Sequence, residues 1–432
     1  MYTKTKLKNG ITFIKVPVKG ARSVTVLALY PIGSRYETRP ISGASHFVEH
    51  MMFKGTEKRP EATDISRTLD ALGADYNAFT SKDYTGYYIK IAAEQQEIAY
   101  DIISDILYHS KFDKDEVEKE KGAIVEELRM YKDNPTMAID MLFDEVMFGD
   151  TPLGWDIGGT PDTVRAVTRE QLNDYYHEHY SPHSMTLIVA GAVGAKDEKK
   201  IVKYFVQKES AKRSHKLDYY KTSFPKFVWD RKELPIEKRI KAEQKNVDQA
   251  HLILGFPGLH NTDPDRYAAT VLINILGVGM SSRLFVEVRE KRGLAYMVRA
   301  GATSYRDVGV THVQAGLDPA RLTEALQVIK AELERIAGEP VTDEELANAK
   351  SNISGRLALS FEDSSAQAEW FGKQYLFNDK IQKPDDILKK IRSVTKDDIR
   401  KVAKRLFGFK DMRLAIISPL PKEKVIDMVK GV

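Results

Sequence analysis

A pattern that occurs twice constrains this chain of 432 residues more than any other feature. Val167-Thr168-Arg169-Glu170 opens an expected helix that leads to a strand at Met185, and Val394-Thr395-Lys396-Asp397 does the same before Met412. The two helix starts (167 and 394) and the two strand starts (185 and 412) are both separated by 227 positions. The alternative explanation is coincidence, since a threonine-capped helix before an edge strand is a common arrangement. We favour a duplicated α+β unit of about 200 residues, because repeated order and spacing together are the mark of duplication.

Hydrophobic periodicity supports this reading along most of the chain. The expected strands are 11–17, 23–30, 75–80, 84–91, 185–190, 250–255, 294–304 and 308–316, and the expected helices are 42–53, 62–72, 93–108, 113–132, 168–179, 263–276 and 319–337, with further helices to about 407. We therefore expect an α+β fold of two homologous α/β domains, each with a mixed or antiparallel sheet and helices packed on one face. The domains are predicted at 1–215 and 246–432, joined by a connector at 216–245 that is rich in Lys and Glu.

Composition excludes several classes of protein. Lys and Arg number 66 against 62 Asp and Glu, so the net charge of +4 gives no basis for nucleic-acid binding. No apolar run reaches the roughly 18 residues of a membrane span. The chain has no cysteine, so disulfides, thiolate nucleophiles and Cys-based metal sites are excluded. Its start shows no signal-like apolar region. A cytoplasmic enzyme without nucleic-acid or membrane partners is the expectation.

The segment His46-Phe47-Val48-Glu49-His50 carries the strongest chemical signal. Four residues advance a helix by slightly more than one turn, so His46 and His50 project from one face and can reach one Zn²⁺. Glu49 is placed beside them to take a proton from water that the metal makes acidic. This order is the H-x-x-E-H of inverzincins. The alternative, a surface helix with two unrelated histidines, fits poorly because the helix is apolar on most sides.

A hydrolytic zinc site needs a third protein ligand and one open position. No third histidine lies nearby, so the candidates are carboxylates on the expected helix 113–132. Glu120 and Glu127 lie seven residues apart beside its apolar stripe, whereas Glu126 points to the opposite side. A carboxylate at the border of a buried face is a candidate ligand. Helix geometry therefore favours Glu127 as the ligand and Glu120 as its supporting residue.

At these residues the chain resembles the zinc peptidases of the pitrilysin, insulin-degrading enzyme and mitochondrial processing peptidase family. In that family 76 residues separate the motif from the ligand glutamate, and 76 residues lie between His50 and Glu127 here. Glu120 matches the family's second glutamate. The segment Asn77-Ala78-Phe79-Thr80-Ser81 resembles its active-site edge strand, and the segment from Arg289 to Tyr296 resembles its C-terminal signature. The length is that of the short, processing-peptidase-like subunits.

The resemblance implies a zinc endopeptidase in which His46, His50 and Glu127 bind Zn²⁺, while Glu49 and Glu120 serve catalysis. The substrate would bind as an added strand against Asn77, Ala78, Phe79 and Thr80. It would also contact Arg289 and Tyr296 of the C-terminal signature. The family also implies a clamshell chamber that selects peptides or unfolded segments. One chain of this length supplies half of a clamshell, so we expect a homodimer whose zinc site receives Arg289 and Tyr296 from the partner.

Three alternatives stay open. In the first, the chain is the catalytic partner of a degenerate paralogue in a heterodimer. In the second, it is a non-catalytic scaffold subunit of the same fold. In the third, it is a zinc hydrolase with a different substrate. The intact ligand set argues against the scaffold. A second histidine group, His177, His179 and His183, is interpreted as a solvated surface, because positions two apart on a helix face different ways.

Overall fold

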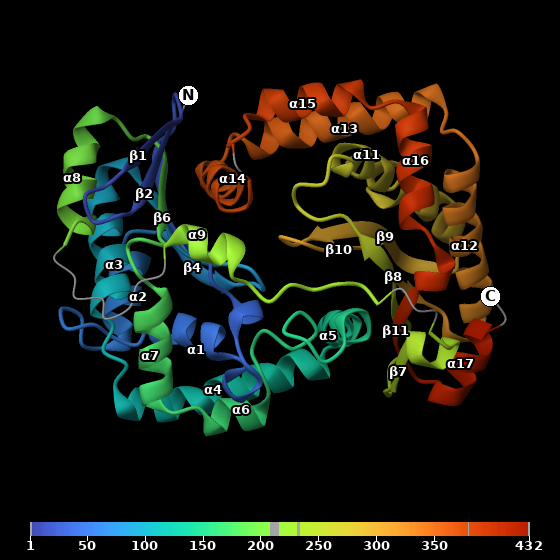
Figure 1. Ribbon diagram of the computed structural model, residues 1–432, viewed down its shortest axis with the longest axis horizontal. Helices are drawn as coiled ribbons and strands as arrows, with labels where there is room; N and C mark the ends of the chain where they lie inside the picture. The colour runs from blue at the N-terminus through green and yellow to red at the C-terminus, as the bar shows by residue number, and fades with distance from the viewer. Residues whose placement is uncertain (1, 208–215, 231–233, 379, 431–432) are drawn as a thin grey trace. The chain divides into compact units, whose positions relative to one another are not determined.

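The computed structural model describes residues 2–207, 216–230, 234–378 and 380–430, and its contacts divide the chain into two compact units (Figure 1). The first unit holds Met1–Arg129, Trp155–Pro225 and Leu359–Ile381, and the second holds Met130–Gly154, Lys226–Ala358 and Gln382–Val432. The sequence analysis expected two contiguous domains, whereas each unit here includes one segment from the other half of the chain. The boundary expected at 215 falls on residues 208–215, outside the described residues.

The first unit contains a six-stranded sheet in the order β1-β2-β6-β3-β5-β4. Its strands are β1 (Thr3–Lys6), β2 (Thr12–Pro17), β3 (Ser23–Tyr30), β4 (Asp75–Thr80), β5 (Thr85–Ala92) and β6 (Thr186–Gly191). The pair β2–β6 is parallel, and all other neighbours are antiparallel. The strand β4, which covers the segment expected to bind substrate, therefore lies at one edge of the sheet.

The second unit contains a five-stranded sheet in the order β7-β11-β8-β10-β9. Its strands are β7 (Ile240–Gln244), β8 (Ala250–Gly258), β9 (Ala295–Ser304), β10 (Gly309–Leu317) and β11 (Arg413–Ser418). The pair β7–β11 is parallel and the others are antiparallel, as in the first sheet without β1. The strand β7 lies in the segment expected to be a connector. Pairing with the distant β11 makes it a strand, and this contact leaves little trace in the local sequence.

Each unit packs several helices around its sheet. The first has α1 (Ala44–Met51), α2 (Ala62–Ala71), α3 (Gln96–His109), most of α4 (Lys114–Asp133), α6 (Pro161–Ala166), α7 (Arg169–His179), α8 (Ala195–Phe205), α9 (Leu217–Thr222) and α14 (Ser364–Phe377). The second has α5 (Pro135–Phe148), α10 (Ile236–Arg239), α11 (Arg266–Gly277), α12 (Leu322–Gly338), most of α13 (Asp343–Ser360), α15 (Pro384–Ser393), α16 (Lys396–Leu406) and α17 (Lys422–Lys430). Thr168 and Thr395 cap α7 and α16, which lead to β6 and β11. The duplicated α+β class is confirmed.

Each sheet has a core on both faces, which corrects the expectation of helices on one face only. Alternate residues of β3 divide between two cores, with Val24 and Val26 on one face and Leu27 and Leu29 on the other. The first face packs against α1 and α3, and the second against α14. In the second unit α5 covers the corresponding face, against β8 and β11.

The two covering helices are the exchanged segments. In sequence α5 follows α4 of the first half, and α14 follows α13 of the second half. Each buries its apolar side on the sheet made by the opposite half of the chain. Hydrophobic periodicity identifies an apolar helix face but not the sheet that covers it. Among the described helices, none combines the length and the apolar character needed to cross a bilayer.

Candidate metal centre

The helix α1, which carries the H-x-x-E-H segment, is held at its N-terminus by a buried acid from outside the helix. Glu37 accepts hydrogen bonds from the backbone amides of Gly43 and Ser45, both at 2.7 Å. These are two of the amides that a helix N-terminus leaves without partners. The N-cap residue is Gly43, at φ +98°. A Cβ at Gly43 would meet the carbonyl oxygen of Gly158 at 2.5 Å, so this close packing requires glycine.

Three side chains from two helices converge beside this helix. His46 and His50 lie one turn apart on α1, and Glu127 comes from α4. The Nε2 atoms of the two histidines are 3.3 Å apart. The Oε2 atom of Glu127 lies 3.8 Å from the His46 Nε2 atom and 3.4 Å from the His50 Nε2 atom. Within the described part of the chain, this is the one group of three or more His, Asp or Glu side chains with metal-binding spacing.

The second glutamate of α4 fixes the orientation of one imidazole. The Oε1 atom of Glu120 lies 2.8 Å from the Nδ1 atom of His50, and its Oε2 atom lies 2.5 Å from the ammonium of Lys54. This contact directs the Nε2 atom of His50 toward Glu127 and His46. Carboxylates commonly hold metal-binding histidines in this way. Glu120 is thus a positioning residue for His50.

The charges of the cluster are suited to a cation. Burial lowers the pKa of His46 to about 4, so this ring is neutral and available as a ligand near neutral pH. Burial also lowers the pKa of His50, but hydrogen bonds with Glu120 and Glu127 outweigh it and raise the value to about 9. The site therefore attracts positive charge, here in the form of a proton.

The geometry fits Zn²⁺. Tetrahedral zinc with bonds of about 2.0–2.1 Å to nitrogen places its ligand atoms about 3.3–3.4 Å apart. The separations of 3.3, 3.4 and 3.8 Å in the cluster lie at or slightly above that range. Two imidazoles and one carboxylate are also the donor set of catalytic zinc sites, which keep one position open. His46, His50 and Glu127 are therefore the residues that would hold the metal.

Glu49 lies beside the cluster and contacts the edge strand. Its Oε2 atom accepts a hydrogen bond of 2.5 Å from the hydroxyl of Thr80, the last residue of β4. Burial raises the pKa of Glu49, while the bond from Thr80 and the charge of His50 act in the opposite direction. A carboxylate with a raised pKa next to a metal site has the properties of a general base. Thr80, expected to bind substrate, also orients this carboxylate.

The edge strand β4 pairs only with β5 among the described strands. Its segment Asn77–Thr80 therefore has one side without a neighbouring strand, and this side ends at the residue that contacts Glu49. An extended peptide can add to such an edge through backbone hydrogen bonds. The structure thus brings the expected peptide-binding segment and the expected general base into contact.

Arg289 and Tyr296 are also close to each other. The guanidinium of Arg289 lies 5.1 Å from the centre of the Tyr296 ring and 4.7 Å from that of Phe285. Tyr296 is 74% exposed and the Arg289 side chain is 37% exposed, so both groups are accessible from solvent. They belong to the second unit, whereas the three candidate metal ligands belong to the first.

Some residues of the site escaped the sequence analysis. Glu37, Lys54 and Asp156 lie outside the motif, and nothing in their local spacing marks them. Asp156 accepts a bond of 2.7 Å from the Gly158 amide, and a Cβ at Gly158 would come within 2.7 Å of the Leu128 side chain. This loop therefore packs closely on the metal-binding face through contacts between distant segments.

The second histidine group, His177, His179 and His183, is only partly exposed. The Nδ1 atom of His179 lies 2.9 Å from the hydroxyl of Tyr220, and the ring packs on Tyr175. Neither His177 nor His183 belongs to a metal-binding group within the described residues. His177 and His183 are exposed, as expected of a solvated surface, whereas His179 is half-buried against Tyr175 and Tyr220.

Comparisons with known proteins agree with the geometry. The family described as "Insulinase (Peptidase family M16)" matches residues 18–160, and "Peptidase M16 inactive domain" matches residues 166–353. A protein of Streptomyces coelicolor named as an uncharacterised zinc protease is 38% identical over 417 residues, or 96% of this chain and 89% of that protein. This chain belongs to peptidase family M16. The uncharacterised zinc protease YmxG of Bacillus subtilis is 34% identical, covering 97% of this chain and 98% of its own length.

Two solved structures share the fold of this chain. A protease from Helicobacter pylori aligns with a TM-score of 0.85 at 23% identity, covering 97% of this chain and 99% of that one. A structure described as the peptidase M16 inactive domain from Pseudomonas fluorescens aligns with a TM-score of 0.86 at 17% identity, covering 97% and 98%. The resemblance inferred from the motifs is confirmed.

The buried position of Glu37 predicts a pH-dependent stability. Burial raises its pKa to about 7 from 4.5, although the amides of Ser45 and Gly43 and the charge of Lys82 lower it. A carboxyl group with a raised folded-state pKa stabilises fully below its unfolded pKa, and this contribution disappears as pH rises through the folded value. We expect the unfolding free energy of the metal-free protein, relative to Glu37→Gln, to fall by about 2–3 kcal/mol between about pH 5 and pH 8.

Urea denaturation of both proteins at the two pH values measures this difference. Glu126→Gln is the matched control, because the Glu126 side chain is 68% exposed and pairs only with Arg129 among the ion pairs of the described residues. If the difference in unfolding free energy between wild type and Glu37→Gln is the same at both pH values, Glu37 is ionised in the folded protein at both.

Proposed function

We propose that this M16 protein is a zinc-dependent endopeptidase that hydrolyses peptides or unfolded polypeptide segments. The observation that supports this most is the contact between Thr80, at the end of a free sheet edge, and Glu49, beside the three metal-binding side chains. A zinc-binding fold without peptidase function has no evident need for a strand edge that ends at the general base. The names of the relatives point the same way.

The residues of the chain have distinct roles in this proposal. A substrate segment adds to Asn77–Thr80 as an extended strand, and its backbone forms the hydrogen bonds that β4 leaves open. Zn²⁺ held by His46, His50 and Glu127 would supply Lewis-acid polarisation of the scissile carbonyl and lower the pKa of water. Glu49 accepts the proton of the attacking water and transfers it to the departing amine. Since binding is through the backbone, selectivity for the substrate sequence is broad.

Metal removal and replacement test the function directly. We expect the purified chain to contain close to one Zn²⁺, to cleave an unstructured peptide mixture, and to leave a stably folded protein uncut. Dialysis against a chelator should abolish cleavage, and added Zn²⁺ should restore it. Mass spectrometry of the products and metal analysis of the same samples provide both measurements.

The outcomes separate the other functions. A chain without zinc and without cleavage would be a non-catalytic scaffold subunit of the same fold. A chain with zinc that cleaves no peptide would be a hydrolase with a different substrate. A zinc-loaded chain that is active only after addition of a paralogue would be the catalytic partner in a heterodimer.

For the assembly we propose a homodimer that encloses a chamber and completes each zinc site with Arg289 and Tyr296 of the second copy. The exposed, adjacent positions of these two side chains support this role. Mixing Glu49→Gln chains with Tyr296→Phe chains should restore activity, because one of the two sites in each mixed dimer then has both groups intact.

The measurement compares the peptidase activity of the mixture with that of each variant alone. Size-exclusion chromatography is the control for dimer formation. If both variants form dimers and their mixture stays inactive, the two side chains do not act across a dimer. We also propose that this protein acts in the cytoplasm.

A further inference from the structure

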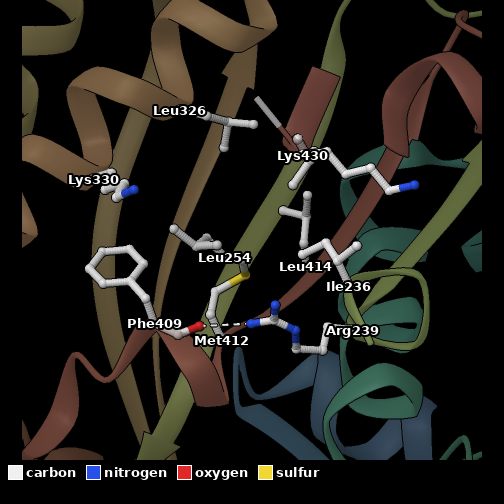
Figure 2. Close-up of a pocket in the computed structure, with 10 residues that line it drawn as sticks. Ile236, Arg239, Leu254, Leu326, Lys330, Phe409, Met412, Leu414 and Lys430 are labelled. Atoms are coloured by element: carbon white, nitrogen blue, oxygen red, sulfur yellow. Dashed lines mark hydrogen bonds between the residues drawn. The ribbon is translucent and has the colours of Figure 1, made fainter. Parts of the chain in front are cut away.

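The second unit contains a pocket of about 280 Å³ that none of the residues discussed above lines. It lies between the short helix α10, the helices α12 and α17, and the strands β8 and β11 (Figure 2). Leu254, Leu326 and Leu414 form its apolar wall and are almost fully buried. The volume is at the small end of the range for ligand pockets, about 300–1,000 Å³, so an occupant is small.

Among the described residues that line this pocket, three are cations and none is an acid. Figure 2 shows Arg239, Lys330 and Lys430 arranged around the leucine side chains. The ammonium of Lys330 lies 5.6 Å from the centre of the Phe409 ring. Lys430 pairs with Glu237 at 2.8 Å, but both side chains are about half exposed, so solvent screens this pair. The pocket therefore carries net positive charge above an apolar wall.

Arg239 contributes a charge that the described residues leave without a carboxylate. Its Nη1 atom donates to the carbonyl oxygens of Phe409 at 2.9 Å and Lys410 at 3.3 Å. Its Nε atom is buried and has no hydrogen-bond partner among the described residues. A guanidinium has five N–H donors in a planar fork suited to a carboxylate, and the acceptors named here are two backbone carbonyls at Nη1.

A neighbouring arginine is affected by this charge. The Arg413 side chain is almost fully buried, and its guanidinium donates to the backbone carbonyl oxygens of Asp411 and Met412. Burial lowers the pKa of Arg413, and the charge of Arg239 lowers it further, while Asp411 and Asp230 act in the opposite direction. Two guanidiniums that repel each other favour a bound anion.

We propose that this pocket binds a small aliphatic monocarboxylate, with its carboxylate on the guanidinium of Arg239 and its hydrocarbon chain against Leu254, Leu326 and Leu414. An inorganic anion would leave the apolar wall in contact with water. A neutral hydrocarbon would cover this wall and leave the guanidinium without a counter-charge. An amphipathic anion satisfies both requirements.

The proposal is independent of the peptidase reaction, so its test uses binding alone. Calorimetric titration of the zinc-loaded full chain with acetate, butanoate, hexanoate and octanoate is the first measurement. Each buried methylene contributes about 0.8 kcal/mol, which corresponds to about a fourfold gain in affinity. We expect the affinity to rise by about this factor per methylene until the pocket is full, and octanoate to bind about 10–100-fold more tightly than octan-1-ol.

Variants separate the charge from the apolar wall. Arg239→Gln should weaken octanoate binding at least about tenfold and leave octan-1-ol binding unchanged. Lys330→Gln, at the pocket margin, should weaken octanoate binding less than Arg239→Gln does. This second variant keeps the test valid if Arg239→Gln does not fold. Arg321→Gln is the control, because the exposed Arg321 pairs with Glu324 outside the pocket.

Three results would overturn the proposal. The first is an affinity that does not depend on chain length, which would indicate an anion site only. The second is equal binding of octanoate and octan-1-ol, which would indicate an apolar pocket only. The third is octanoate binding that both Arg239→Gln and Lys330→Gln leave unchanged, which would place the ligand elsewhere.

Discussion

Replacing Glu49 by glutamine should reduce the rate of peptide cleavage by about 10²–10⁴-fold and leave the zinc content unchanged. The amide has the size of the carboxylate and can still accept the hydrogen bond that Thr80 donates at 2.5 Å. It cannot accept a proton from water. The loss therefore falls on the catalytic step, and kcat should decrease with little change in KM.

Steady-state cleavage of a fluorogenic peptide and metal analysis of the same preparation measure both quantities. Glu126→Gln is the control, since it exchanges the same groups on the exposed side of α4. Retention of more than about a tenth of the wild-type rate by Glu49→Gln would remove this residue as the general base.

Replacing Glu127 by alanine should abolish tight zinc binding. The Oε2 atom of Glu127 is the one carboxylate oxygen of the three-residue cluster and lies 3.4 and 3.8 Å from the two histidine Nε2 atoms. Its loss leaves two imidazoles, fewer than the three protein ligands of catalytic zinc sites. We expect the zinc content after dialysis to fall from about one ion per chain to near zero, and activity to be lost with it.

Thermal unfolding provides a readout that does not depend on activity. Zinc at about 100 times its dissociation constant stabilises a folded protein by about 2.7 kcal/mol, so added Zn²⁺ should raise the Tm of the metal-free wild type. The same addition should not raise the Tm of Glu127→Ala, whereas the neighbouring Glu126→Ala should respond like the wild type. Full zinc content and a normal Tm response in Glu127→Ala would show that another residue is the third ligand.

Much of the metal centre followed from spacing within single helices. His46 and His50 are one turn apart on any helix, and Glu120 and Glu127 are two turns apart. Their relative directions depend only on helix geometry. The choice of Glu127 over Glu126 had the same basis, and the structure places Glu127 at the cluster and Glu126 in solvent.

Other parts of the site depend on contacts that no local pattern encodes. Glu37 lies six residues before Gly43 and in a separate turn, yet its carboxylate holds the start of α1. The contact between Thr80 and Glu49 joins a strand and a helix that lie 31 residues apart in the sequence. The strand β7 exists through its parallel pairing with β11 near the C-terminus.

The sequence by itself determined the repeated α+β plan, through hydrophobic periodicity and repeated spacing. It also determined that His46 and His50 share a helix face, as do Glu120 and Glu127, because spacing within a helix fixes direction over one or two turns of backbone. The edge strand was implied by the resemblance to the family. Only the tertiary structure decided that α5 and α14 each cover the sheet of the opposite half, that Glu37 caps α1, and that Arg239 faces a pocket whose described lining residues include no acid. Burial and charge at these places arise from surfaces that meet after the chain has folded, and segments far apart in the sequence supply those surfaces.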